Sequence, residues 1–317
     1  MKAAILCICV ALTAGACKKS GGGGGGGGGG TGWLVGTDGM MLNVQADGST
    51  TGYNTATQAS LNAIACRGGD EAWVVGSQGT VLHTTDAGAT WHPQTVPTTA
   101  DLRALATQDA GPVFVAGNGV FLTSADAGAS WIALGDGKAN FRSIAAAQAG
   151  ETVLAVAEDG SLWSYEGGQL VQRGSFAGAR AVAVTPDGQT AVLVGNHLIS
   201  RSADGGRTWS AASGADSAAY SYDDVRISDE GEALAVGTAG AVAHIPATGT
   251  ASVQLLGTAD LHTIHLAEPD EHASSVGYTA GEGGQVWITK DGGSTWAKGP
   301  NAGQTVLGVD EIGEGHR

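Results

Sequence analysis

The sequence has little positive charge, with 15 Lys and Arg against 30 Asp and Glu among its 317 residues. Its formal charge of −15 leaves no basic surface to neutralise phosphates, so we expect no nucleic-acid partner. The chain beyond the N-terminal segment also lacks helical hydrophobic periodicity and any apolar run long enough to cross a bilayer. Because 42% of the residues are hydrophobic, a disordered acidic chain is excluded. These absences leave a folded, acidic, β-rich body.

Cysteine is scarce, and its placement points to an exported protein. Lys2 precedes an apolar stretch over residues 3–12, and small residues lead from there to Cys17. The stretch is too short to span a bilayer. The small-small-Cys arrangement resembles a bacterial lipobox, which implies cleavage before Cys17 and acylation of that residue. The alternative is an ordinary cleaved signal followed by a chance cysteine.

The resemblance divides the chain into a lipoprotein signal over residues 1–16, a lipidated Cys17 with its tether over 17–30, and a folded body over 31–317. The tether contains a run of glycines, which have high backbone entropy and no side chain to bury, so we expect it to be flexible. The lipid would hold the body at the periplasmic or outer-membrane surface of a bacterial cell envelope. The sequence leaves the choice of membrane open. Cys66 remains after processing, and its apolar neighbours predict a buried core residue.

Four segments of the body share the pattern Ser/Thr-x-Asp-x-Gly-x-Ser/Thr-Trp. The Asp and Trp positions are Asp86 with Trp91, Asp126 with Trp131, Asp204 with Trp209, and Asp291 with Trp296. Their spacing of about 40 residues, or twice that, is typical of a propeller blade. Weaker copies at residues 47–50, 164–168 and 246–249 complete seven units. Short β-rich runs between the motifs predict a four-stranded antiparallel meander in each unit.

The two ends of the body complement each other. The first unit begins at Trp33 without an innermost strand, whereas residues 305–309 form an isolated β-rich run at the C-terminus. Pairing between these ends would complete the first blade and remove the exposed sheet edges of an open ring. We therefore predict an all-β fold, a single seven-bladed propeller closed by a C-terminal innermost strand.

The four motifs are Asp-boxes of the bacterial neuraminidase repeat, and the blade pattern resembles the photosystem II stability/assembly-factor-like group of propellers. The resemblance implies that the box is a structural turn between the third and fourth strands. Its Asp would accept hydrogen bonds from its own hairpin, its Gly would adopt positive φ, and its Trp would pack between blades. Each turn offers one carboxylate, which is too few for a Ca²⁺ site. The resemblance also implies a non-catalytic scaffold that binds a protein or peptide.

A candidate binding face follows from the register of the innermost strands, which begin at the rim opposite the Asp-boxes. The residues that follow the first apolar position of each strand are Asn62, Arg103, Arg142, Arg180, Asp223, His262 and Leu307. Three arginines on consecutive blades form a basic arc suited to carboxylates of a peptide or an anionic sugar. Alternatively, these arginines pair with neighbouring acidic residues or line a wet channel.

The long connection over residues 210–222 adds two aromatic candidates, Tyr220 and Tyr222, to the same face. Tyrosine-rich loops on a rigid scaffold often bind partners, although a long solvated loop is the alternative. The predicted binding set is therefore Arg103, Arg142, Arg180, Asp223, His262, Tyr220 and Tyr222.

No complete catalytic constellation is found in the sequence. A sialidase-like hydrolase needs an arginine triad, a Tyr nucleophile held by a Glu, and an acid, and no Tyr-Glu pair can be assigned. The histidines lack metal-ligand spacing, and no phosphate-binding loop follows a strand. We expect a monomeric, non-enzymatic protein without metal or cofactor, whose partner is a protein or peptide. A glycan-binding or sialidase-like protein is the alternative, and a structural spacer is the third possibility.

Overall fold

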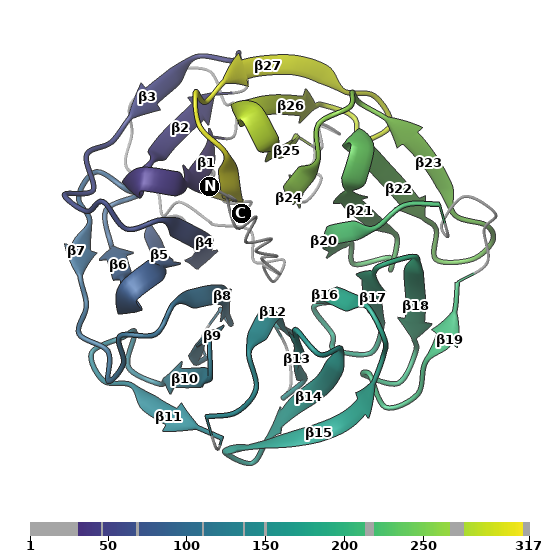
Figure 1. Ribbon diagram of the computed structural model, residues 1–317, viewed down its shortest axis with the longest axis horizontal. Coiled ribbons are helices and arrows are strands. Elements are labelled where there is room, and N and C mark those ends of the chain that lie inside the picture. The colour runs from purple at the N-terminus through teal and green to yellow at the C-terminus, as the bar shows by residue number, and fades with distance from the viewer. Residues whose placement is uncertain are drawn as a thin grey trace, which may run out of the picture.

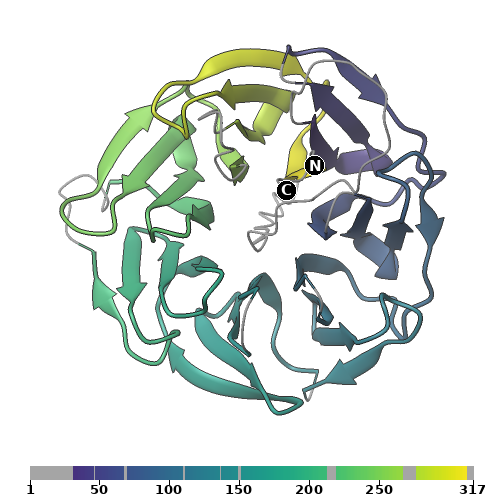
Figure 2. The same ribbon diagram turned by 180° about the vertical axis from the view of Figure 1, so that it is seen from behind.

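The computed structural model describes residues 31–45, 47–67, 70–109, 111–135, 137–148, 151–212, 219–266 and 276–312. Seven four-stranded antiparallel sheets surround a central axis in this part of the chain (Figures 1 and 2). The predicted all-β, seven-bladed propeller is confirmed. The described residues include no helix that is long and apolar enough to span a membrane. The predicted signal, the lipidated Cys17 and the tether lie outside the described residues.

Each blade is a meander that runs outward from the axis, and the blades are numbered here along the ring. Blade 1 contains β28 (Val306–Ile312), β1 (Thr31–Gly36), β2 (Met41–Gln45) and β3 (Thr50–Gly52). Blade 2 contains β4 (Leu61–Arg67), β5 (Glu71–Gly76), β6 (Val81–Thr84) and β7 (His92–Pro93). Blade 3 contains β8 (Leu102–Thr107), β9 (Val113–Gly117), β10 (Val120–Ser124) and β11 (Ile132–Leu134). Blade 4 contains β12 (Phe141–Ala146), β13 (Val153–Ala157), β14 (Ser161–Glu166) and β15 (Gln169–Ser175).

The remaining three blades follow the same plan. Blade 5 contains β16 (Ala179–Val184), β17 (Ala191–Gly195), β18 (Leu198–Ser202) and β19 (Ser210–Ala211). Blade 6 contains β20 (Tyr222–Ile227), β21 (Ala233–Gly237), β22 (Ala241–Ile245) and β23 (Ser252–Leu255). Blade 7 contains β24 (Leu261–Leu266), β25 (Gly277–Gly281), β26 (Gln285–Thr289) and β27 (Ala297–Asn301). Short 3₁₀ turns join second to third strands at η1 (Thr37–Gly39), η2 (Ser77–Gly79), η3 (Thr238–Gly240) and η4 (Glu282–Gly284).

The ring closes through the two ends of the chain. Strand β28 pairs antiparallel with β1, from Thr31 opposite Ile312 to Val35 opposite Gly308. Figure 1 shows the yellow C-terminal strand beside the purple N-terminal strand in one blade. The predicted closure is confirmed. The pairing completes the four strands of blade 1, so β1 has a neighbour on the side of the axis.

The hydrophobic core is divided among the interfaces between successive blades. At the interface of blades 1 and 2, for example, Trp33 and Val35 pack against Ile64 and Cys66. Cys66 is buried and carries a free thiol, as predicted. Alternate residues of each innermost strand face the preceding and the following blade, so every strand contributes to two interfaces.

Polar side chains link the innermost strands across several interfaces, because these strands belong to separate sheets. The Thr107 hydroxyl donates to the Cys66 carbonyl at 3.0 Å, and the Ser143 hydroxyl accepts from the Val182 amide at 3.1 Å. The Asn62 amide also donates to the Leu102 carbonyl at 2.7 Å. Such bonds satisfy backbone groups that the meander leaves unpaired near the axis.

The Asp-boxes are turns between third and fourth strands, and the Asp of each box accepts hydrogen bonds from its own hairpin. In the first box, Asp86 accepts from the Thr90 amide and hydroxyl at 2.8 and 2.6 Å. Gly88 has a φ of +81°, and a Cβ there would lie 2.4 Å from the Trp33 ring of the preceding blade. Trp91 packs against the same ring at 5.8 Å, so the box joins two blades. The other three boxes repeat the same hydrogen bonds around Asp126, Asp204 and Asp291.

Replacement of Asp86 by Asn tests this turn. Hydrogen bonds from Thr90 hold the pKa of Asp86 at about 2, below its usual value of 3.8. The carboxylate therefore stabilises the fold above about pH 4, and this stabilisation is lost as the pH falls toward 2. We expect Asp86→Asn to lower Tm at pH 7 by about 2–4 °C, which corresponds to about 1 kcal/mol in a protein of this size.

Thermal unfolding followed by circular dichroism between pH 7 and pH 2 measures this effect. The difference in Tm between wild type and variant should narrow below pH 4. Asp109→Asn, at an exposed aspartate outside the boxes, is the control and should change little. An Asp86→Asn variant with wild-type Tm at pH 7 would contradict the role of the turn.

Candidate functional site

The innermost strand of every blade has an irregularity near its start. The pairing register shifts there in all seven blades. The residues at the irregularity are Asn62, Arg103, Arg142, Arg180, Asp223, His262 and Leu307. These are the seven positions that the sequence register predicted to be equivalent. A bulge re-aims its side chain, so the ring of bulges forms a distinct mouth around the axis.

The mouth and the Asp-boxes lie at opposite rims. The Ser77 amide of η2 donates to the Ser60 carbonyl, which ties a second-to-third turn to the start of an innermost strand. The Ala87 amide of the first Asp-box donates to the Asp70 carbonyl, which ties the box to a first-to-second turn. The side chains of the mouth are therefore separated from the boxes by the length of a strand.

Arg103 is anchored by a carboxylate of the next blade. Its guanidinium forms an ion pair with Glu158, which lies in the turn between β13 and β14. Burial alone would raise the pKa of Glu158, but hydrogen bonding and the charge of Arg103 lower it, with a contribution from Arg142. Glu158 therefore remains charged and lies within the electrostatic reach of two arginines. Arg103 Nε is buried and has no hydrogen-bond partner among the described residues.

A second ionic chain crosses blades 5, 6 and 7. Arg180 pairs with Asp223, and the other oxygen of Asp223 lies 3.4 Å from His262 Nδ1. Asp223 is 2% exposed, and burial alone would raise its pKa. The hydrogen bond from His262 and the charge of Arg180 reverse this effect and lower the pKa. Two of the three arginines thus pair with neighbouring carboxylates, which is the alternative that the sequence left open.

Arg142 is half-buried between these two pairs, on blade 4. The mouth therefore contains three arginines and two carboxylates on four consecutive blades, with His262 on the next, and Arg103, Asp223 and His262 are themselves buried. A guanidinium has five N–H donors, so an arginine that pairs with one carboxylate keeps donors for a second. The two ion pairs limit the rotamer freedom of Arg103 and Arg180.

The two predicted tyrosines lie in the interface of blades 5 and 6. Tyr222 is fully buried in its hydrophobic cluster, and Tyr220 packs partly against the same cluster. Tyr222 is therefore a core residue, out of reach of a partner. Residues 213–218 of the same connection lie outside the described residues.

Sequence reasoning missed a buried polar cluster on blades 6, 7 and 1. Asp224 accepts from the Ile264 amide at 2.9 Å, and Arg226 Nε donates to the Ile264 carbonyl at 3.0 Å. Further round the ring, Asp310 accepts from the Cys66 amide at 2.8 Å and lies 2.8 Å from His265 Nδ1. The corresponding positions of blades 2 and 3 hold alanines, so an alignment of the repeats would have revealed the cluster.

This cluster contains ionisable groups that are removed from water. Burial raises the pKa of Asp224 to about 7, against the opposing charge of Arg226 and two backbone hydrogen bonds. Burial lowers the pKa of Arg226, although the charges of Asp224 and Asp310 oppose this shift. Within the described ranges, no group of three or more His, Cys, Asp or Glu side chains has the arrangement to hold a metal ion.

Comparison with known proteins agrees with the Asp-box pattern. The family model of the photosynthesis system II assembly factor YCF48 matches residues 29–176. The match covers slightly less than half of the chain, so residues 29–176 resemble this family. The structure of YCF48 bound to D1 peptide has a TM-score of 0.63 and 16% identity, with 90% of this chain and 91% of that chain covered.

Two other solved structures show the same fold. YCF48 from Cyanidioschyzon merolae has a TM-score of 0.59 and 17% identity, and the alignment covers 78% of this chain and 87% of that one. The WD40 β-propeller domain of Doa1 has a TM-score of 0.65 and 13% identity, with coverages of 88% and 90%. At these identities the structural similarity concerns the fold alone. No curated protein sequence matches the chain.

The buried Asp224 predicts a pH dependence for the stability of the propeller. Because its folded pKa lies above the usual 3.8, the folded state holds the proton more tightly than the unfolded state. Its contribution to stability is therefore lost as the pH rises from about 4 through 7. Asn cannot ionise, so the Asp224→Asn variant lacks this loss. It should be less stable than wild type at pH 5, and the gap should narrow at pH 8 because the wild type loses stability.

Urea unfolding at pH 5, 6, 7 and 8 gives the free energy of unfolding of both proteins. We expect the difference in free energy of unfolding between wild type and Asp224→Asn to shrink from pH 5 to pH 8. Asp109→Asn, at an exposed position, serves again as the control. A difference that stays constant from pH 5 to pH 8 would show that Asp224 does not titrate in this window.

Proposed function

We propose that this chain is a non-catalytic scaffold, lipid-anchored in a bacterial cell envelope, that binds a protein or peptide at the mouth of its propeller. The observation that carries the proposal is the ring of bulged residues with arginines on three consecutive blades. The YCF48 structure with D1 peptide supports peptide binding by a propeller of this kind. The D1 peptide belongs to that protein and is not assigned as the partner here.

The chemistry of the mouth favours a ligand with carboxylates. The body beyond residue 30 carries a formal charge of −18 once Lys2, Lys18 and Lys19 are left out of the count. An acidic segment is therefore repelled by most of the surface, and Arg103, Arg142 and Arg180 form a local exception. A C-terminal carboxylate or an Asp or Glu side chain suits the bidentate geometry of Arg. Glu158 and Asp223 keep two of these guanidiniums in position before binding.

Removal of the arc tests the proposed function. We expect the triple variant Arg103→Gln, Arg142→Gln, Arg180→Gln to lose at least tenfold in affinity for a partner captured by the wild-type chain. Binding by wild type should also weaken as salt is raised from 50 to 300 mM, because the attraction is ionic. The measurement is capture from gently solubilised envelope, identification by mass spectrometry, and titration of the purified partner.

A second triple variant provides a control of equal charge. Arg173, Arg207 and Lys298 are exposed residues of blades 4, 5 and 7 that lie away from the mouth. Their replacement by Gln should leave the affinity within about twofold of wild type. Equal loss in both triple variants, or full retention in the arc variant, would overturn the assignment. Circular dichroism and Tm must first show that both variants are folded.

The anchor is tested separately, at Cys17. If this residue carries the lipid, Cys17→Ser moves the protein from the membrane pellet to the soluble fraction after cell disruption, and metabolic labelling with palmitate is lost. Cys66→Ser is the matched control, because Cys66 is buried in the propeller. This variant should stay labelled and membrane-bound. Palmitate labelling that persists in the Cys17→Ser variant would contradict the lipoprotein assignment.

A further inference from the structure

Most interfaces between blades are completed by two side chains that project into them. One is the box Trp of the following blade, and the other comes from the connection that joins the blades. Between blades 1 and 2 these are Trp91 and Tyr53, whose rings lie 5.8 and 4.6 Å from Trp33. Between blades 4 and 5 they are Trp209 and Phe176, with ring centroids 5.7 Å apart. The interface geometry therefore accommodates aromatic rings at both positions.

The interface of blades 3 and 4 lacks both of these aromatic side chains. Blade 4 replaces the Asp-box by a tight hairpin at Gly167 and Gly168, with φ values of +55° and +86°. Strand register pairs Tyr165 with Leu170, so Leu170 occupies the position of the missing box Trp. Among the described residues of the connection from blade 3, Ala139 packs at this interface. The weak copy of the motif at residues 164–168 is thus a turn at the expected place without the box.

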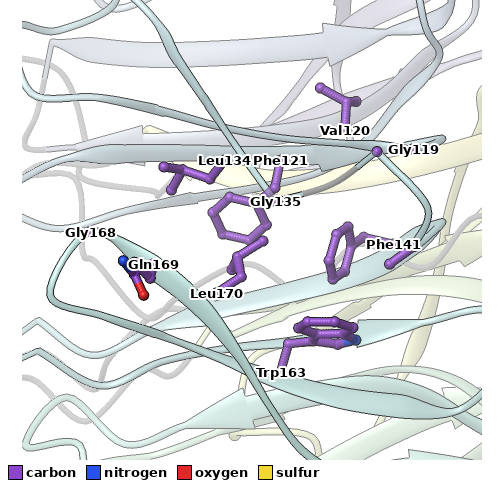
Figure 3. Close-up of a pocket in the computed structure, with 12 residues that line it drawn as sticks. Gly119, Val120, Phe121, Leu134, Gly135, Phe141, Trp163, Gly168, Gln169 and Leu170 are labelled. Atoms are coloured by element: carbon purple, nitrogen blue, oxygen red, sulfur yellow. The ribbon is translucent and has the colours of Figure 1, made fainter.

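The small side chains leave a pocket of about 400 Å³, called here the blade 3–4 pocket. Figure 3 shows its apolar wall, which consists of Phe121, Leu134, Phe141, Trp163 and Leu170. The rings of Phe121 and Phe141 lie 5.5 Å apart, and those of Phe141 and Trp163 lie 6.2 Å apart. Gly119, Gly135 and Gly137 also line the pocket, and they leave its rim open to an approaching backbone. The volume lies at the lower end of the range of small-ligand sites.

We propose that the blade 3–4 pocket binds an aromatic side chain of the peptide partner. The inference rests on the proposed function, because it gives that partner an aromatic residue. The interfaces of blades 1 and 2 and of blades 4 and 5 indicate the shape of the occupant. The chain itself places Trp91 and Trp209 at the matching position there. Edge-to-face contacts with Phe141 and Trp163 would add to the burial of apolar area.

The chain itself offers no suitable ring for this pocket. Every Phe, Tyr and Trp of the sequence lies within the described residues, so the other segments cannot supply one. The large hydrophobic side chains exposed in the described part are Ile132 and Leu255, neither of which is aromatic. The aromatic rings are all buried or half-buried in the propeller, so a second copy presents none that is fully exposed. These observations favour a ring from a different molecule.

The pocket and the arginine arc share strand β12. Phe141 lines the pocket, and the next residue of β12 is Arg142, at the bulge of blade 4. A peptide with an aromatic residue next to an acidic one would use both features. The aromatic ring would supply the buried contact, and the carboxylate would supply the ionic one.

Isothermal titration of the full chain with two uncharged pentapeptides tests the pocket apart from the arc. The probes are acetyl-Gly-Gly-Trp-Gly-Gly-amide and the same peptide with Ala in place of Trp. We expect saturable binding of the Trp peptide with a Kd below about 1 mM and at least tenfold weaker binding of the Ala peptide. The Leu170→Trp variant, which restores the box ring, should bind the Trp peptide at least tenfold more weakly than wild type.

Ala302→Phe is the matched control, because Ala302 is the connection residue at the interface of blades 7 and 1. It should leave binding of the Trp peptide unchanged, and Ala139→Phe should weaken it as Leu170→Trp does. The arc variants should also bind this uncharged peptide normally, so the two proposals fail independently. Equal binding of the two peptides, or normal binding by the folded Leu170→Trp variant, would overturn the proposal. Binding of free indole without binding of the Trp peptide would overturn it as well.

Discussion

The pairing of β28 with β1 is the constraint on which the rest of the structure depends. Until residues near both ends of the chain meet, the innermost position of blade 1 is empty, and blades 7 and 2 each lack a neighbour at the axis. Closure places the seven innermost strands around one axis, where their bulges form the mouth. It also brings Asp310 of β28 against His265 and the Cys66 amide, so the last strand links the blades on either side of it.

The fold could be predicted because each of its determinants is local and repeated. The Asp-box recurs with the same Asp-to-hydroxyl hydrogen bonds, and its spacing gives the blade length. The equivalence of Arg103, Arg142 and Arg180 was predictable for the same reason, since a bulge recurs at one register position. The missing first strand of the first unit was itself the signal for closure.

The partners of the site residues were not predictable, because they depend on the geometry between blades. Glu158 lies in a turn of blade 4 and has no motif that marks it as the partner of Arg103. Tyr222 is the predicted first apolar residue of an innermost strand as well as a predicted binding residue, and its complete burial between blades 5 and 6 excludes the second role. The blade 3–4 pocket arises because the hairpin of blade 4 is shorter than an Asp-box, which only the pairing of Tyr165 with Leu170 reveals.

The structure thus separates a rim at which the Asp-boxes join the blades from the opposite mouth, where we propose that a partner binds. Hydrogen–deuterium exchange of the full chain with and without its captured partner tests this separation most directly. The account predicts slower exchange in the segments at the mouth of blades 4 and 5, residues 137–142 and 176–180, with unchanged exchange in the Asp-box turns, such as residues 86–90. Protection confined to the Asp-box turns, with the mouth unchanged, would contradict it.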